Sequence, residues 1–216
     1  NTILYLAAHS TTAINITLFS ASIPIITLIM STVLLKHKPS RWQLLGIACS
    51  FLGVAIIVTK GSFYQLLSLT INPGDLMVIG IACVWSLYSV LLRKYPINLK
   101  PLALLTTFIA AGLPWLLVLT VIEWMAVPNI HVTGADGLLF LYIAVFPSIL
   151  AYLFWTYGVT TVGPNVAALS TYLMPLFTAA IAIPLLGERL AVSQLLGGLL
   201  ILAGLYLGSL FRANPH

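Results

Sequence analysis

Polar and aromatic side chains recur at helical spacing inside the apolar runs of this chain, and they are the residues best placed to bind a solute. Ser148, Tyr152 and Thr156 follow one another at intervals of four residues, which places them on one face of a helix. Trp85 and Tyr88 form a second such stripe. Hydroxyl groups and ring faces of this kind can orient a small polar or amphipathic solute inside a cavity.

Two further pairs of polar residues have the same kind of spacing. Asn15 and Ser22 are seven residues apart, and so are Asn165 and Tyr172, the latter on a face with Pro175. We therefore expect a substrate cavity lined by polar and aromatic residues from several helices: Asn15, Ser22, Trp85, Tyr88, Ser148, Tyr152, Ser170 and Tyr172. The alternatives are that the aromatic residues form the interfacial belt of a membrane protein and that the serines pack helices together.

Pro24 and Pro175 lie in the middle of apolar runs, where proline breaks the hydrogen-bond ladder of a helix. One interpretation is a harmless kink whose freed carbonyl is satisfied by neighbouring groups. The other is a pair of hinges that opens or gates a cavity. The sequence leaves both interpretations open.

Signatures of catalysis and of metal or cofactor binding are missing from the sequence. It has no His-Glu-x-x-His, Gly-x-Ser-x-Gly or Walker A motif, so we expect neither an enzyme nor a resident cofactor. Cys49 and Cys83 fall in apolar surroundings and are interpreted as packing residues. The net charge of +5 comes from a few basic residues between apolar runs, which argues against nucleic-acid binding.

The composition indicates that most of the protein surface faces lipid rather than water. Hydrophobic residues make up 61% of the 216 residues and charged residues only 6%, too few to cover a water-facing surface. Backbone polar groups must be hydrogen-bonded within the protein inside the bilayer, so only helices or closed barrels can span it. The apolar runs are continuous and about 20 residues long, which predicts transmembrane helices rather than the alternating strands of a barrel.

The runs predict an all-α integral membrane protein with one partial and seven full spans. The partial span covers 1–9, and we expect the chain to begin inside a helix. The full spans are 12–34, 42–59, 75–92, 101–122, 137–158, 164–186 and 191–210. Residues 60–74 and 123–136 are the longer connections.

The distribution of charge predicts the orientation. Seven of the nine lysines and arginines fall on the side that holds the loop after span 12–34, and only Lys60 and Arg189 fall on the other. The positive-inside rule then places the C-terminus in the cytoplasm of a multi-pass protein of the plasma (inner) membrane. No Asp, Glu, Lys or Arg is expected deep in a span, because all four acids fall at or beyond the span ends: Asp75, Glu123, Asp136 and Glu188.

The sequence also matches itself when it is shifted by 151 positions. Pro24 meets Pro175, Gly53 meets Gly204, and the run Gln-Leu-Leu-Gly at 43–46 recurs at 194–197. This offset spans five helices, and an odd number turns the second copy upside down. We therefore predict inverted five-helix repeats, with 1–60 as the truncated first copy and 74–211 as the complete second copy.

The order and spacing of several short motifs resemble the EamA-type drug/metabolite transporter superfamily. The motifs are Gly74-Asp75, Trp85-Ser86-Leu87-Tyr88-Ser89, Phe146-Pro147-Ser148, Ala151-Tyr152, Val162-Gly163-Pro164, Pro175, Leu186-Gly187-Glu188-Arg189 and Gln194-Leu195-Leu196-Gly197. The resemblance implies a full-length protein of ten helices that moves small metabolites, often as an exporter. One departure is that Lys36-His37 stands where the first copy usually has a Gly-Glu pair.

These observations favour a secondary transporter or exporter of amino-acid-, amine- or drug-like solutes that works by alternating access in the lipid bilayer. The alternative is a membrane-embedded enzyme or sensor without transport activity. A channel is a third class, but no charged ring or carbonyl filter motif is present in the sequence.

Overall fold

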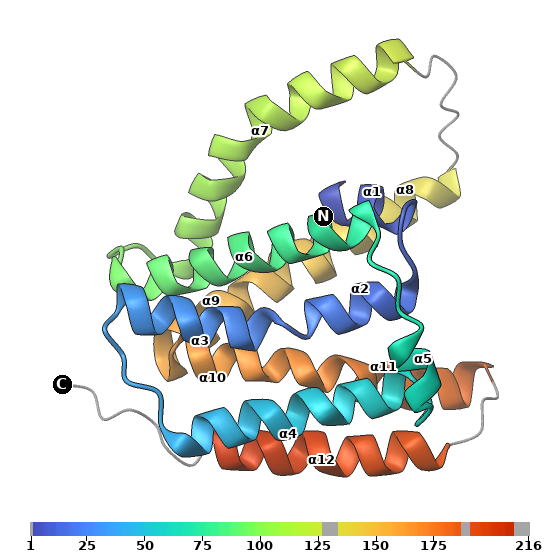
Figure 1. The fold of residues 1–216 in the computed structure, drawn as a ribbon. Helices are drawn as coiled ribbons and strands as arrows, with labels where there is room; N and C mark the ends of the chain where they lie inside the picture. Colours follow the sequence, from blue (N-terminus) through green and yellow to red (C-terminus); the bar gives the residue numbers. More distant parts are fainter. Residues whose placement is uncertain (1, 127–133, 187–190, 210–216) are drawn as a thin grey trace.

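The computed structural model describes residues 2–126, 134–186 and 191–209, and these residues form helices with no strand among them (Figure 1). The first part of the chain contains α1 (Thr2–Ala8), α2 (Ala13–Ser20), α3 (Ile23–Leu34), α4 (Arg41–Val58), α5 (Phe63–Leu67), α6 (Pro73–Lys94) and α7 (Pro101–Ala126). The second part contains α8 (Gly134–Ile143), the π-helical segment η1 (Ala144–Leu150), α9 (Ala151–Val162), α10 (Pro164–Leu169), the 3₁₀ segment η2 (Ser170–Leu173), α11 (Met174–Leu186) and α12 (Val192–Ser209).

Seven stretches of helix in the described residues are long and apolar enough to cross a membrane. They correspond one to one with the seven predicted spans, and the predicted all-α membrane fold is confirmed. The observed boundaries differ from the predicted ones by a few residues, most at the ends of α7 and α9, and residues 60–74 are predicted as a connection. Here the structure has the short helix α5, and α6 begins at Pro73 because proline fits the first turn of a helix.

The outer faces of the helices carry large apolar side chains that only lipid can cover. Val33, Val84 and Phe154 each keep about 70% of their surface exposed on long apolar helices. Exposing such a surface to water would cost free energy in proportion to its area. A multi-pass arrangement in the bilayer follows from these faces.

One end of the bundle collects most of the described basic residues. The loop from α3 to α4 carries Lys36 and Lys38, and α4 begins with Arg41. The end of α6 carries Arg93 and Lys94. The Arg93 guanidinium donates to the carbonyl of Thr160 in α9, at 2.7 Å, which places the end of α9 at the same end of the bundle (Figure 1). Arg189 and Arg212, which also entered the charge argument, lie outside the described residues.

The repeated Gln-Leu-Leu-Gly run begins two helices with the same hydrogen bond. The Gln43 side-chain oxygen accepts from the Ser40 amide at 3.1 Å, and the Gln194 oxygen accepts from the Ala191 amide at 2.9 Å. These bonds satisfy amides that a helix N-terminus leaves unpaired. Glu188, one of the four acids at the span ends, lies outside the described residues.

Helices α4 and α12 pack against each other through glycine. A Cβ on Gly46 would lie 2.5 Å from the Gly204 carbonyl oxygen, and a Cβ on Gly53 would lie 2.5 Å from the Gly197 carbonyl oxygen. Only glycine therefore lets the two backbones approach this closely. We call this contact, made by Gly46, Gly53, Gly197 and Gly204, the glycine seam.

The glycine seam has its own symmetry. As residue numbers rise along α4 they fall along α12, so the two helices are antiparallel. At the centre the Ser50 hydroxyl donates to the Ile201 carbonyl at 3.3 Å, and these two residues are 151 positions apart. Equivalent helices therefore meet antiparallel about a local two-fold axis, as inverted repeats require. The repeat boundaries 1–60 and 74–211 remain a prediction.

Candidate functional site

The span predicted at 12–34 is broken in the middle. Helix α2 ends at Ser20 and α3 begins at Ile23, with Pro24 as its second residue. Proline has no amide hydrogen, so the Ser20 carbonyl loses its helical partner four residues on. The Ser22 hydroxyl donates to the Phe19 carbonyl at 2.5 Å and is therefore engaged by the break itself.

The equivalent span of the second copy is broken at the equivalent place. Helix α10 ends at Leu169, the 3₁₀ segment η2 follows, and α11 begins at Met174 with Pro175 as its second residue. Pro175 removes the helical partner of the Thr171 carbonyl, which instead accepts from the Met174 amide in a 3₁₀ turn. Thr171 and Ser20 are themselves 151 positions apart.

A cavity of about 390 Å³ lies between the two breaks. Each break contributes residues at equivalent positions of the repeat, and the rest of the lining comes from α1, α2, α4, α11 and α12. The equivalent lining residues are Ser20 with Thr171, Ala21 with Tyr172, and Ile23 with Met174. Among the described residues that line it, none is an acid, lysine, arginine or histidine.

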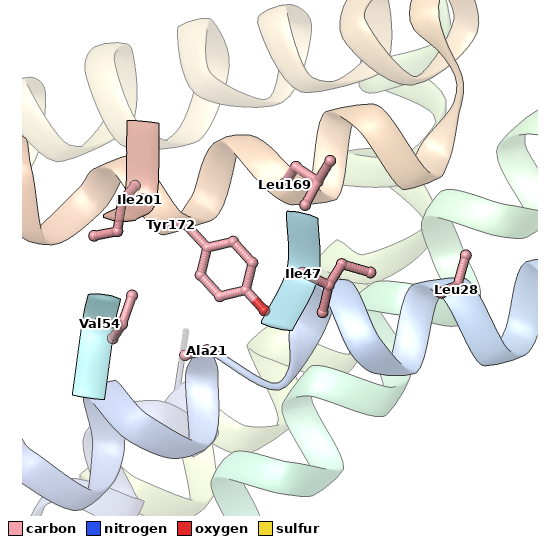
Figure 2. Packing of buried hydrophobic residues seen from close by; sticks show 7 residues of the cluster. All are labelled: Ala21, Leu28, Ile47, Val54, Leu169, Tyr172 and Ile201. Carbon is pink, nitrogen blue, oxygen red and sulfur yellow. The ribbon is translucent and has the colours of Figure 1, made fainter. Parts of the chain in front are cut away.

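Tyr172 joins this cavity to the apolar core. Only 1% of its surface is exposed, and its ring packs among Ala21, Val54 and Ile47 (Figure 2). Ala21 and Val54 also line the cavity. The Tyr172 hydroxyl has no hydrogen-bond partner among the described residues, and an unsatisfied buried hydroxyl costs about 1–3 kcal/mol.

Asn15 does not face this cavity but helps to hold Asp75. Its side-chain amide donates to the Asp75 carboxylate at 2.9 Å and to the Thr70 carbonyl at 3.1 Å. The Thr11 hydroxyl and the Asn72 amide, the latter at 2.8 Å, also donate to this carboxylate. The sequence places Asp75 at a span end, whereas the structure buries it completely in the first turn of α6.

Helix α6 also contacts the far side of the first break. The Thr27 hydroxyl donates to Ser86 at 2.9 Å, and the Ser86 hydroxyl lies 3.3 Å from the Ile23 carbonyl. Both side chains are completely buried. Because α6 binds α2 through Asp75 and α3 through Ser86, it fixes both halves of the broken helix.

The predicted aromatic residues gather in a second place. The Trp85 ring centroid lies 5.6 Å from that of Tyr88, 5.3 Å from that of Tyr152 and 5.1 Å from that of Trp155. The Trp155 indole donates to the Ser89 hydroxyl at 3.0 Å. These rings fill the space between α6 and α9 by contact with one another.

Trp155→Phe is expected to lower the free energy of unfolding by about 1–2 kcal/mol, because the Ser89 hydrogen bond and part of the ring contact are lost. Thermal unfolding of the purified protein in detergent measures this. The matched control is Tyr157→Phe, two residues along α9 with 64% of its surface exposed, which leaves stability unchanged. Equal effects of the two substitutions would contradict a packing role for the cluster.

Residues 1–59 and 72–210 of this chain match the model of the EamA-like transporter family. The chain belongs to this family. The family resemblance of the sequence motifs is thereby confirmed.

Two curated relatives of this EamA-like protein are also named as transporters. An uncharacterized transporter of Bacillus subtilis, YyaM, is 29% identical over 211 residues, covering 97% of this chain and 68% of that protein. An uncharacterized transporter of Archaeoglobus fulgidus is 30% identical over 203 residues, covering 94% of this chain and 69% of that protein. A solved crystal structure shares the fold with a TM-score of 0.77 at 15% identity, covering 97% of this chain and 72% of that chain.

The remaining predicted residues of the EamA-like site have local partners. The Ser170 hydroxyl donates to the Ala167 carbonyl at 2.7 Å, and the Ser170 side chain is exposed. The Ser148 hydroxyl donates to the Ile143 carbonyl at 2.9 Å, five residues back, because this segment is π-helical. A π-helical turn holds more residues than an α-helical one, so the spacing of four does not keep Ser148 in line with Tyr152.

Of the predicted residues, the cavity between the breaks brings together Tyr172 and Pro175. Pro24 is fully buried at the other break. The cavity also contains polar residues that the sequence reasoning missed: Thr17, Ser20, Thr171, Thr178 and Gln194. For Ser20 and Thr171 a signal was available, since each lies four residues before one of the paired prolines.

Proposed function

We propose that this EamA-like protein is a secondary transporter or exporter of small amino-acid-, amine- or drug-like solutes, and that the cavity between the two breaks is its solute site. The observation that carries this proposal is the pair of interrupted helices, broken at equivalent repeat positions and facing one cavity. Interrupted helices at a repeat interface form the substrate sites of many secondary transporters. A gradient of solute or ion would supply the energy, since the sequence has no Walker A motif.

The breaks supply the mobility that alternating access needs. Half-helices joined by a turn or by a 3₁₀ segment can tilt separately, because no continuous α-helical hydrogen-bond ladder joins them. Pro24 and Pro175 would then act as paired hinges. The halves of the first break are both held by α6, through Asp75 and Ser86, so we expect the larger movement at α11.

The charge distribution supports an orientation. Lys36, Lys38, Arg41, Arg93 and Lys94 gather at one end of the bundle, and Lys60 lies at the opposite end of α4. We propose that the basic end faces the cytoplasm, which places the C-terminus there in a plasma-membrane protein.

Ala179→Phe is expected to abolish solute flux through this transporter. Ala179 lines the cavity on α11, and a phenyl ring would occupy space that the solute needs. Uptake of a panel of radiolabelled amino acids, amines and aromatic amides into proteoliposomes containing the full chain measures the effect.

Ala180→Phe is the matched control for that substitution. Ala180 is the next residue on α11, is exposed, and does not line the cavity, so flux should persist. Unchanged flux in the Ala179 variant would place the solute path elsewhere. A well-folded protein that moves no member of the panel would instead favour a membrane-embedded enzyme or sensor.

A further inference from the structure

Within the part of the chain that the structure describes, the lining of the cavity between the breaks contains no side chain that could balance a charge. Its described lining contains no acid, lysine, arginine or histidine. The buried carboxylate of Asp75 is not part of the lining and already accepts hydrogen bonds from Thr11, Asn15 and Asn72. A charged solute would lose its water without gaining a counter-charge, which is strongly unfavourable in a membrane interior.

The polar groups of the cavity include acceptors whose own protons are already used. The Thr17 hydroxyl donates to the Ala13 carbonyl at 2.8 Å, and the Thr171 hydroxyl donates to the Ala168 carbonyl at 2.7 Å. A hydroxyl has one proton and two lone pairs, so both oxygens can still accept. Pro24 has no amide hydrogen to donate to the carbonyl of Ser20. Because Ser20 lines the cavity, this carbonyl is a further backbone acceptor.

The lining of the cavity also includes a hydrogen-bond donor. The Gln194 side-chain oxygen accepts from the Ala191 amide, so the NH₂ group is the part of this side chain that can donate to a solute. The Tyr172 hydroxyl has no partner among the described residues, but it is buried in the apolar core and is not counted as a donor to the solute. Apart from the hydroxyl groups of Ser20 and Thr178, the rest of the described lining is apolar, with side chains such as Ile23, Val54 and Met174.

From this lining we infer that the cavity binds an uncharged amphipathic solute with an apolar body and a polar head that donates hydrogen bonds, as a primary amide does. The inference rests on the proposed function only in taking this cavity as the solute site, and among the proposed solute classes it selects the uncharged, drug-like one. The head group's N–H would bind the Ser20 carbonyl and the Thr171 hydroxyl oxygen, and the apolar body would fill the rest of the 390 Å³ cavity.

Four probes with one phenyl body test this inference: phenylacetamide, its ester counterpart methyl phenylacetate, the cation phenethylammonium and the anion phenylacetate. Isothermal titration of the full chain in detergent should give the amide the lowest Kd. We expect the ions to bind at least tenfold more weakly, and the ester about tenfold more weakly because it has no N–H donor.

Two variants connect the preference to the named acceptors. Pro24→Ala restores an amide hydrogen that can occupy the Ser20 carbonyl, and Thr171→Val removes a hydroxyl while keeping the side-chain shape. Each should weaken amide binding by about five- to tenfold and leave ester binding unchanged. Pro114→Ala is the control, because Pro114 lies inside α7 and away from the cavity.

Either of two results would overturn the inference: an ion that binds as tightly as the amide, or amide binding that neither variant changes. Failure of the proposed function would give a different result, because a solute can bind to the cavity without being transported. A chain that binds the amide but transports nothing refutes the transporter and keeps the site. A charged solute whose flux Ala179→Phe blocks keeps the transporter and refutes this choice of solute.

Discussion

Gly204→Ala is expected to destabilise the protein by about 3 kcal/mol or more, the upper part of the range for overpacked interiors. The new methyl group would collide with the Ser50 side chain and lie 2.5 Å from the Gly46 carbonyl oxygen and 2.7 Å from the Ser50 amide nitrogen. Two of these three atoms are backbone, so no rotamer change can relieve the contact. Thermal unfolding of the purified protein in detergent, with size-exclusion profiles before heating, measures the loss.

Gly80→Ala is the matched control for the glycine seam. Gly80 also lies inside a long apolar helix, α6, but a Cβ there would meet nothing within 4 Å. Alanine is the better helix former, by about 0.5–1 kcal/mol, so this variant should be as stable as the original or slightly more stable. A Gly204 variant that unfolds together with the Gly80 variant would show that α4 and α12 tolerate a wider separation.

Asp75→Ala is the second substitution with a large expected effect. It removes the common acceptor of the Thr11 hydroxyl, the Asn15 amide and the Asn72 backbone amide, and leaves these donors buried or half-buried without it. Each buried or half-buried donor left without its partner costs about 1–3 kcal/mol, so the loss of three such bonds should cost about 3–5 kcal/mol. We expect a loss of stability in that range and a loss of flux, because α6 would no longer hold α2.

Asp75→Asn separates the hydrogen bonds from the charge. Asparagine keeps one acceptor oxygen at nearly the same place but replaces the other with a donor, which would face the donors that now bind it. We expect an intermediate loss of about 1–3 kcal/mol by the same unfolding measurement. If the alanine and asparagine variants were both as stable as the original, the network would have no role in joining the helices.

The sequence predicts the spans well because span length depends on an average property, the length of an apolar run. The seven runs can be recognised even when each end is uncertain by a few residues. The repeat at an offset of 151 positions can be recognised because several matching residues are in register. The paired prolines coincide with the two helix breaks, but proline alone does not predict a break, since Pro114 lies inside the continuous helix α7.

The partners of individual side chains were beyond the reach of the sequence. Asp75 reads as an acid at a span end, and only the fold brings Asn15, 60 residues away, to its carboxylate. Helical spacing groups Trp85 and Tyr88 correctly, but it does not say whether their rings line a space or fill it. The π-helical segment around Ser148 changes the spacing itself, which no count of residues can reveal.

A substitution at any of the four positions of the glycine seam cannot be compensated by a second substitution within the seam. A crowded contact is ordinarily relieved when the residue on the opposite helix becomes smaller. Here a Cβ on each of the four glycines would lie 2.5 Å from the carbonyl oxygen of the glycine opposite, and a backbone oxygen is removed by no substitution. Each copy of the repeat therefore constrains the other, because both α4 and α12 must keep glycine at the positions where they meet.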